Sequence, residues 1–159
     1  SSFPPIIINE SKILILGSIP GVKSLEMQQY YAHPQNKFWK IICEIFNEKF
    51  TTDYTERIKI LEKYHVALWD VIDTCERKGS LDSEIRNEEA NKIGELLHNY
   101  PNIKAIFCNG QKSYKNLQKI LPKDFYLPII VLPSTSPAHA SLRYEEKLLS
   151  WQKIKNYLP

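Results

Sequence analysis

Short apolar runs alternate along the chain with longer stretches in which apolar residues recur every three or four positions. A short apolar run predicts a buried strand, and the longer recurrence predicts an amphipathic helix with one face in the core. We place strands at residues 12–17, 66–72, 103–109 and 125–133. We place helices at residues 36–46, 53–64, 88–100, 111–121 and 142–158, and a long polar loop at residues 73–87.

Local signals mark the ends of several of these elements. Asn36 stands where it caps the first helix, serves in catalysis, or does both. Asp53 followed three residues later by Glu56 has the form of a capping box. Pro128 has no N–H group, so it restricts the pairing of the last strand on one side.

Strands that alternate with helices require crossover connections, which produce a mainly parallel sheet between layers of helices. We therefore predict an α/β fold, a three-layer α/β/α sandwich with a mainly parallel four-stranded central sheet. The 159 residues are enough for one hydrophobic core, and no linker or repeat divides them. A single domain spanning residues 1–159 is the simplest organisation.

Composition narrows the function classes only slightly. The three cysteines, Cys43, Cys75 and Cys108, form no CxxC pair, which argues against zinc and against a four-thiolate cluster. No apolar run approaches membrane-spanning length and no signal peptide is evident, so we expect a soluble, cytoplasmic protein. The net charge of +3 permits a nucleic-acid partner without arguing for one.

The unusual loops of the chain all follow predicted strands. They are Gly17 to Gly21 (GSIPG), the segment after Asp70, Asn109–Gly110, and residues 133–141. In a parallel sheet the carboxyl ends of the strands meet at one edge, where ligands bind. We therefore expect these four loops to form a single cleft.

Two of the loops carry groups suited to phosphate. In GSIPG the glycines let backbone N–H groups turn outward, and Ser18 adds a hydroxyl; the alternative is a plain turn at a strand end. The loop PSTSPAHAS offers three hydroxyls, a rigid proline and His139, unless it is a structural turn before the last helix. Lysines at positions 112, 115, 119 and 123 form either a solvated helix face or a stripe that follows phosphates.

Other side chains in these loops suit a planar ligand. Tyr30 and Tyr31 are either core residues or stacking surfaces for a flat ring. Asp70 ends a strand at the ligand edge, where it caps a loop or accepts a proton donor from a bound base. His65 and His98 have no partner pattern and read as structural residues.

Five motifs in order then resemble one enzyme family. They are G-S-x-P-G-x-x-S-L, Y-Y-A-H-P-x-N-x-F-W, L-W-D-V, G-S-L-D-S-x-I and L-P-S-T-S-P-A. Together they resemble the uracil-DNA glycosylase superfamily, most closely its hypoxanthine-DNA glycosylase (DNA-deoxyinosine glycosylase) branch. They are also similar to the mismatch-specific uracil/thymine-DNA glycosylases. The resemblance runs from about Lys12 to the last helix.

This resemblance implies a monofunctional DNA glycosylase, a monomer without cofactor or metal, that acts on DNA containing a deaminated base. Such enzymes extrude the nucleotide from the duplex into a pocket. The roles it suggests for a base pocket fall to Gly17, Ser18, Ile19, Pro20, Gly21, Tyr31, Asp70 and His139. Those for gripping the DNA backbone fall to Ser24, Ser134, Thr135, Ser136, Pro137 and Ala138, with Leu142 or Arg143 as the wedge that fills the gap.

One position departs from the pattern of the family. The mismatch-uracil branch has G-I-N-P-G as its first motif, and its Asn positions the attacking water; Ile19 occupies that slot here. In the hypoxanthine branch the Asn of A-H-P-x-N has this role, and that residue is Asn36. We therefore expect Asn36 to be catalytic and His33 to order the loop. A uracil- or mismatch-type enzyme, or a non-catalytic module that binds damaged DNA or nucleotides, is the alternative.

Overall fold

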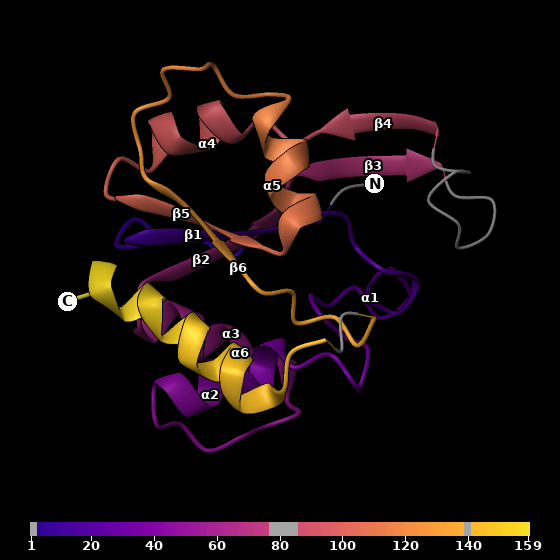
Figure 1. The fold of residues 1–159 in the computed structure, drawn as a ribbon, viewed down its shortest axis with the longest axis vertical. Helices are drawn as coiled ribbons and strands as arrows, with labels where there is room; N and C mark the ends of the chain where they lie inside the picture. The colour runs from indigo at the N-terminus through magenta and orange to yellow at the C-terminus, as the bar shows by residue number, and fades with distance from the viewer. Residues whose placement is uncertain (1–2, 77–85, 139–140) are drawn as a thin grey trace.

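A parallel four-stranded sheet lies at the centre of the protein (Figure 1). The computed structural model describes residues 3–76, 86–138 and 141–159. The strands β1 (Ile13–Gly17), β2 (Val66–Asp70), β5 (Ala105–Asn109) and β6 (Ile129–Leu132) pair in the order β2-β1-β5-β6. All three pairings are parallel, which confirms the predicted fold class.

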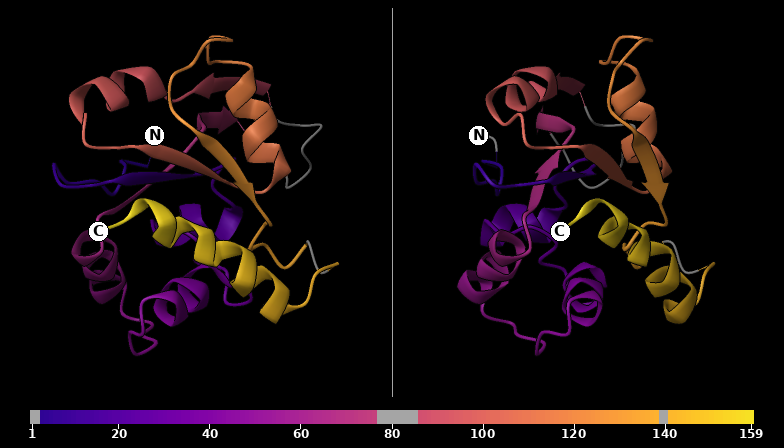
Figure 2. Two further views of the ribbon diagram at one scale, coloured as in Figure 1. Left: turned by 60° about the vertical axis from the view of Figure 1, so that its left-hand side comes forward. Right: turned by 90° about the vertical axis from the view of Figure 1, so that its left-hand side faces the viewer.

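Helices cover both faces of this sheet (Figure 2). One face packs against α2 (Phe38–Ile45), α3 (Tyr54–Lys63) and α6 (Tyr144–Trp151), and the other against α4 (Ile93–Asn99) and α5 (Gln111–Gln118). Alternate residues of β1 contribute to the two cores, Ile13 and Ile15 to the first and Leu14 and Leu16 to the second. Every residue of this central strand is buried, as a strand covered on both sides requires.

The segment that follows β2 differs from its prediction. We expected a polar loop over residues 73–87 and a helix from residue 88. Instead β3 (Ile72–Glu76) and β4 (Arg86–Ala90) form an antiparallel two-stranded ribbon, and α4 begins only at Ile93. The residues of both strands are mostly polar, so the hydrophobic pattern carries no strand signal; backbone pairing between the strands defines them.

A second missed element is α1 (Val22–Met27), a short helix directly behind the GSIPG turn. Because the preceding residues 17–21 are rich in glycine and proline, we had expected the loop to continue through this segment. Other elements are shorter than predicted. The last strand starts after Pro128, whose carbonyl accepts the N–H of Ile106, and α6 continues as a 3-10 helix, Gln152–Tyr157. In the part of the chain that the structure describes, no helix has the length and apolar character needed to cross a bilayer.

Candidate active site

The carboxyl ends of β1, β2 and β5 and the loop after β6 surround a cavity of about 450 Å³. This arrangement confirms that the loops after β1, β5 and β6 converge on one edge of the sheet; from the second predicted loop only Asp70, the last residue of β2, reaches the cavity, because the chain continues directly into β3. The predicted site residues that line the cavity are Gly17, Ser18, Ile19, Gly21, Ser24, Tyr31, Asn36, Asp70, Ser134, Thr135, Ser136 and Pro137. The cavity volume and its mixed polar and apolar walls suit a small planar ligand.

The floor of the cavity is the junction between β1 and β2. The carbonyls of Gly17 and Ser18 accept the N–H groups of Val71 and Ile72, both at 2.9 Å, and Ser18 Oγ accepts Asn116 Nδ2 at 2.9 Å. Gly17 is required here for space rather than for a turn: a Cβ at this position would overlap Asp70 Oδ1 and lie 2.8 Å from the Tyr31 hydroxyl.

Asp70 brings a carboxyl group into this apolar floor. The residue is 4% exposed, and among the described residues its Oδ2 has no hydrogen-bond partner. Burial raises the pKa of Asp70 to about 7, because the carboxylate loses its hydration without gaining a compensating donor. An unsatisfied buried oxygen at a cavity floor is a group that a ligand donor can stabilise.

Tyr31 meets Asp70 above Gly17. Its backbone is left-handed, with φ of 53°, and its ring stacks on Phe38 with centroids 4.3 Å apart. The hydroxyl is buried and makes no well-formed hydrogen bond in the described ranges. Burial, and then the charge of Asp70, raise the pKa of Tyr31, while the nearby side chain of Asn109 acts in the opposite direction. One ring face is therefore occupied by Phe38, while the residue also lines the cavity.

Buried side chains hold the Tyr31 segment in place. The indole N–H of Trp39 donates to the carbonyl of Tyr30 at 2.8 Å, directly before Tyr31. Ser24 Oγ accepts the N–H of Ala32 at 3.2 Å, and Ser24 is only 7% exposed. The Ser24 hydroxyl, expected to hold the DNA backbone, thus contributes to positioning Tyr31.

Asn36 lines the cavity, and from the position before the N-cap residue, Lys37, its side chain also caps the start of α2. Its Oδ1 accepts the N–H of Phe38, the first residue of α2, at 2.9 Å. Its own N–H donates to the carbonyl of His33, and His33 Nδ1 accepts the N–H of Gln35 at 3.1 Å. The imidazole of His33 therefore orders this loop. The amide of Asn36 retains Nδ2 and a second lone pair on Oδ1 for a ligand or a water.

The serine loop, residues 133–138, is built from side chain to backbone hydrogen bonds. Ser134 Oγ accepts the N–H of Ser136 at 3.1 Å, and Ser136 Oγ accepts that of Ala138 at 3.2 Å. Thr135 is buried and forms two bonds of 3.0 Å with Asn109, one from each partner. The hydroxyl of Thr135 is therefore committed inside the protein, whereas Ser134 and Ser136 are half-buried and line the cavity.

Comparison with known proteins places the chain in a family. A family model described as the uracil DNA glycosylase superfamily matches residues 4–157. The chain belongs to the uracil-DNA glycosylase superfamily. Two similar relatives are named hypoxanthine DNA glycosylase: one from Methanosarcina barkeri, 37% identical over 89% of each chain, and one from Methanosarcina acetivorans, 35% identical over 86% of each. A solution NMR structure from Methanosarcina acetivorans, described as a candidate uracil DNA glycosylase, is similar over 97% of both chains with 30% identity and a TM-score of 0.81.

Some residues that the superfamily resemblance suggested lie away from the cavity lining. Pro20, within the first motif, is buried and does not line the cavity. Ala138 is exposed and does not line it either. Leu142 and Arg143 follow the serine loop on the outer surface, where Leu142 is 39% exposed and the Arg143 guanidinium pairs with Glu146 at 3.5 Å. His139 and the motif G-S-L-D-S-x-I fall outside the described residues.

Two residues of the cavity were expected only as part of an unusual loop and not as site residues. Asn109 carries the clearest signal in retrospect, since it is a polar residue at the end of an apolar strand and precedes Gly110. Gly110 has φ of 94° and comes so close to Ser134 that an added Cβ would lie 3.1 Å from the serine Cβ. These two residues therefore fix the serine loop against the end of β5.

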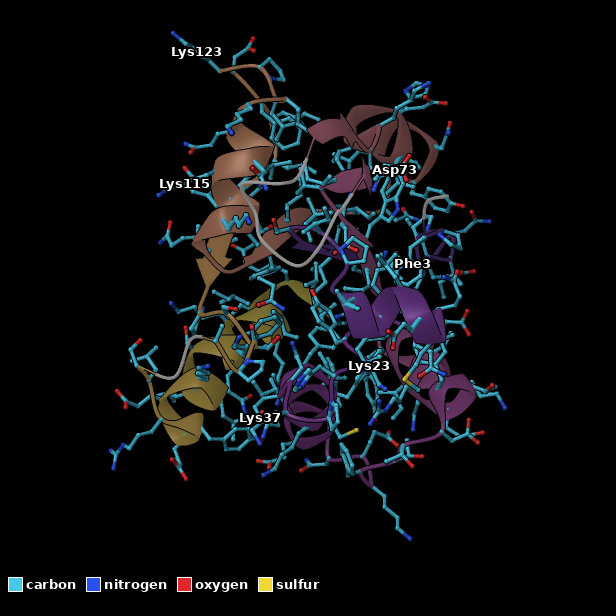
Figure 3. All side chains as sticks on the ribbon, turned by 90° about the vertical axis from the view of Figure 1, so that its right-hand side faces the viewer. Phe3, Lys23, Lys37, Asp73, Lys115 and Lys123 are labelled. Atoms are coloured by element: carbon cyan, nitrogen blue, oxygen red, sulfur yellow. The ribbon has the colours of Figure 1, made fainter. Side chains whose placement is uncertain are left out.

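Lysines lie on several segments of this side of the molecule. Figure 3 labels Lys23 on α1, Lys37 directly before α2 and Lys115 on α5. Lys23 and Lys112 line the cavity itself. Of the four lysines read as a solvated helix face or a phosphate stripe, Lys112 and Lys115 lie on α5, while Lys119 and Lys123 follow it. Within the ranges that the structure describes, no three His, Cys, Asp or Glu side chains come together as a set of metal ligands.

Proposed function

We propose that this protein is a monofunctional DNA glycosylase that hydrolyses the N-glycosidic bond of a deaminated base in DNA, with hypoxanthine preferred. Membership of the uracil-DNA glycosylase superfamily and the names of the two Methanosarcina relatives support this activity. The observation that carries the base preference is the buried carboxyl of Asp70, whose Oδ2 has no partner among the described residues. The whole chain acts as one domain and as a monomer.

The chemistry of Asp70 suits the edge that deamination creates. Deamination of adenine replaces the amino group and the N1 acceptor with the O6 acceptor and the N1–H donor of hypoxanthine. A carboxylate oxygen accepts N1–H, and adenine has no such hydrogen at N1. The ring of Tyr31, backed by Phe38, offers the stacking surface for the extruded base. Asp70 therefore recognises the hydrogen-bonding edge of the base, while Tyr31 stacks on its ring.

Water replaces the base at the sugar carbon. As the bond between C1′ and the base nitrogen breaks, positive charge develops on the sugar and negative charge on the base. The amide oxygen of Asn36 orients a water whose hydroxyl bonds to C1′ and whose remaining proton goes to the departing base. An amide has no useful pKa, so it orients the water without removing a proton. Backbone N–H groups of Ser18 and Ile19 stabilise the leaving base.

Ile19 is consistent with this division of roles. Its side chain packs on the core next to the cavity and cannot orient water. The first motif accordingly shapes the base pocket, and the catalytic contribution moves to Asn36, which lines the same cavity. The DNA phosphates, held by the serine loop, add negative charge close to the sugar cation.

A substrate panel tests the proposal. Labelled duplexes containing deoxyinosine, deoxyuridine or a G·T mismatch are incubated with the protein, and abasic sites are then cleaved with alkali. We expect cleavage at deoxyinosine to be fastest. Faster cleavage at deoxyuridine reassigns the base preference, and binding to deoxyinosine DNA without abasic product from any duplex overturns the enzymatic assignment.

A further inference from the structure

The helix α5 makes two side-chain contacts with the end of β1. The buried hydroxyl of Ser113 donates to the carbonyl of Leu16 at 2.7 Å. One turn later on the same helix, Asn116 Nδ2 donates to Ser18 Oγ at 2.9 Å. The two acceptors stand directly before and directly after Gly17, whose backbone forms the floor of the base cavity. The helix α5 therefore fixes the chain on both sides of this floor residue.

Ser18 is also held from the side of β2, which places it close to Asp70. Its carbonyl accepts the N–H of Ile72 at 2.9 Å. Gly17 is the partner of Asp70 in the pairing of β1 with β2, so Ser18 directly follows the residue that lies beside Asp70. Both Ser18 and Asp70 line the base cavity. A hydroxyl and a carboxyl group thus lie near each other at the same end of the sheet.

The direction of the bond from Asn116 decides what the Ser18 hydroxyl can do. A serine hydroxyl has one hydrogen to donate and two lone pairs that accept. Because Asn116 Nδ2 is the donor, this bond uses one lone pair of Ser18 Oγ and leaves the O–H hydrogen unused. The approaching N–H group also repels that hydrogen, which therefore turns away from α5. Ser18 is half-buried at the cavity, so its O–H group remains available to a ligand there.

Two other polar side chains of the cavity are already engaged within the protein. The amide of Asn109 donates from Nδ2 to Thr135 Oγ1 and accepts the N–H of Thr135 at Oδ1, both at 3.0 Å. The Oδ1 atom of Asn36 accepts the N–H of Phe38. Ser18 differs from both, because the contact that holds its side chain supplies a hydrogen to the hydroxyl and does not consume the hydrogen that the hydroxyl carries.

We propose that Asn116 is a positioning residue that orients the Ser18 hydroxyl as a donor to the O6 carbonyl of hypoxanthine, which makes Ser18 a specificity-determining residue. The proposal rests on the proposed glycosylase function. Asp70 accepts the neighbouring N1–H group, so the two side chains together recognise both groups that deamination creates. Adenine presents an amino group at C6, whose hydrogens face the hydroxyl hydrogen of Ser18. A site built around such polar groups rejects a base that leaves them unpaired.

Reversing the direction of the Asn116 bond tests this proposal. At pH 7, Asn116→Asp retains the size of the side chain but replaces its N–H donor with a carboxylate oxygen. The Ser18 hydroxyl should then donate to the new carboxylate and no longer to the base. Two duplexes are compared, one with deoxyinosine and one with 2′-deoxy-6-thioinosine, in which sulfur, a weak acceptor, replaces O6 while N1–H remains.

The quantity measured is the preference of each protein for deoxyinosine over its thio analogue. It is obtained from affinities by fluorescence anisotropy and from single-turnover excision rates. We expect this preference to fall about 10-fold relative to wild type in Asn116→Asp and in Ser18→Ala, since each loses the hydrogen bond to O6. In Asn116→Ala the hydroxyl rotates freely, and the preference should fall about 3-fold.

A matched variant separates the direction of the bond from the added charge. Gln118→Glu places the same negative charge at an exposed residue of α5, and it should keep the wild-type preference even if it weakens DNA binding. Thermal unfolding shows whether each variant is folded. Asn116→Ala provides the test of Asn116 if Asn116→Asp is not.

The outcomes distinguish the contact, its positioning and the proposed function. An unchanged preference in Ser18→Ala overturns the contact with O6. A reduced preference in Ser18→Ala together with wild-type preference in the Asn116 variants overturns the role of Asn116. If the wild type yields no abasic product from any duplex, the glycosylase function itself fails. The affinities still test the contact in that case, because binding requires no cleavage.

Discussion

The floor of the base cavity and the serine loop are both polar, yet they satisfy their polar groups in opposite ways. In the serine loop each hydroxyl of Ser134 and Ser136 already accepts a backbone N–H of its own loop. At the floor, the carboxyl of Asp70 and the hydroxyl of Tyr31 are buried, and each retains an oxygen without a partner among the described residues. The hydroxyls of the loop are therefore already hydrogen-bonded without DNA, whereas the floor still has buried oxygens without a partner among the described residues.

This difference separates binding of the DNA backbone from recognition of the base. A loop whose hydroxyls are already fixed keeps its O–H groups pointing outward for phosphate, and it does so for any sequence or base. A buried carboxyl that lacks a donor gains most from the one ligand that supplies it, and a ligand that lacks the donor leaves it unsatisfied. We therefore assign affinity to the serine loop and base discrimination to the floor.

The largest expected effect comes from filling the floor. In Gly17→Ala the new methyl group overlaps Asp70 Oδ1 and crowds the Tyr31 hydroxyl, so both groups must move from the base position. We expect excision of hypoxanthine to fall at least 100-fold, measured as single-turnover rate. The matched variant Gly94→Ala, in α4, places its methyl group where no described atom lies within 4 Å, and it should retain full activity. Wild-type rates in Gly17→Ala contradict the assignment of the floor.

The second prediction separates the two roles of Asn36. Asn36→Ala removes the oriented water and the cap of α2, so we expect the excision rate to fall about 100-fold and the unfolding free energy by about 1 kcal/mol. Asp53→Ala is the control, because Asp53 caps α3 by accepting the N–H groups of Thr55 and Glu56. That variant should lose similar stability and keep its activity. Equal loss of activity in both variants reduces Asn36 to a cap.

The hydrophobic pattern was enough to predict the central sheet and the placement of the site. Alternation of buried strands with amphipathic helices gives the layers, and parallel strands bring the loops after residues 17, 70, 109 and 132 to one edge. The ribbon of β3 and β4 could not be predicted this way, because its strands are polar and its stability comes from mutual backbone pairing. The pattern also could not reveal the need for space at Gly17, because that need comes from a carboxyl on another strand, a contact between residues 53 positions apart in the sequence.

The third prediction uses the protonation of Asp70. The carboxyl titrates at about 7 in the folded protein and near 3.8 in the unfolded chain, so the folded state binds the additional proton between these values. Stability should therefore fall as pH rises from about 4 to 7 and then stay level. Asp70→Asn removes this dependence and should raise the unfolding free energy at pH 8 by up to roughly 4 kcal/mol. Urea unfolding at pH 5 and pH 8 measures it.

A control and an opposite outcome define that test. Asp124→Asn makes the same chemical change at an exposed aspartate outside the base cavity. It should leave the pH profile of stability as it is in the wild type. If Asp70→Asn is less stable than the wild type at pH 8, the carboxylate has a donor in the folded protein. The contrast between the unsatisfied floor and the satisfied loop would then fail.

The smallest effect should come from the serine loop, and its form matters more than its size. Ser136→Ala removes the hydroxyl of a residue that lines the base cavity, together with its bond from the N–H of Ala138, while the bond of Ser136 N–H to Ser134 Oγ remains. One phosphate hydrogen bond is lost, so KM should rise about 3-fold to 10-fold with kcat unchanged, and equally for deoxyinosine and deoxyuridine duplexes. Steady-state kinetics on both duplexes check this, with Ser150→Ala on α6 as the control. A change in the ratio between the two substrates would place base discrimination in the loop as well as in the floor.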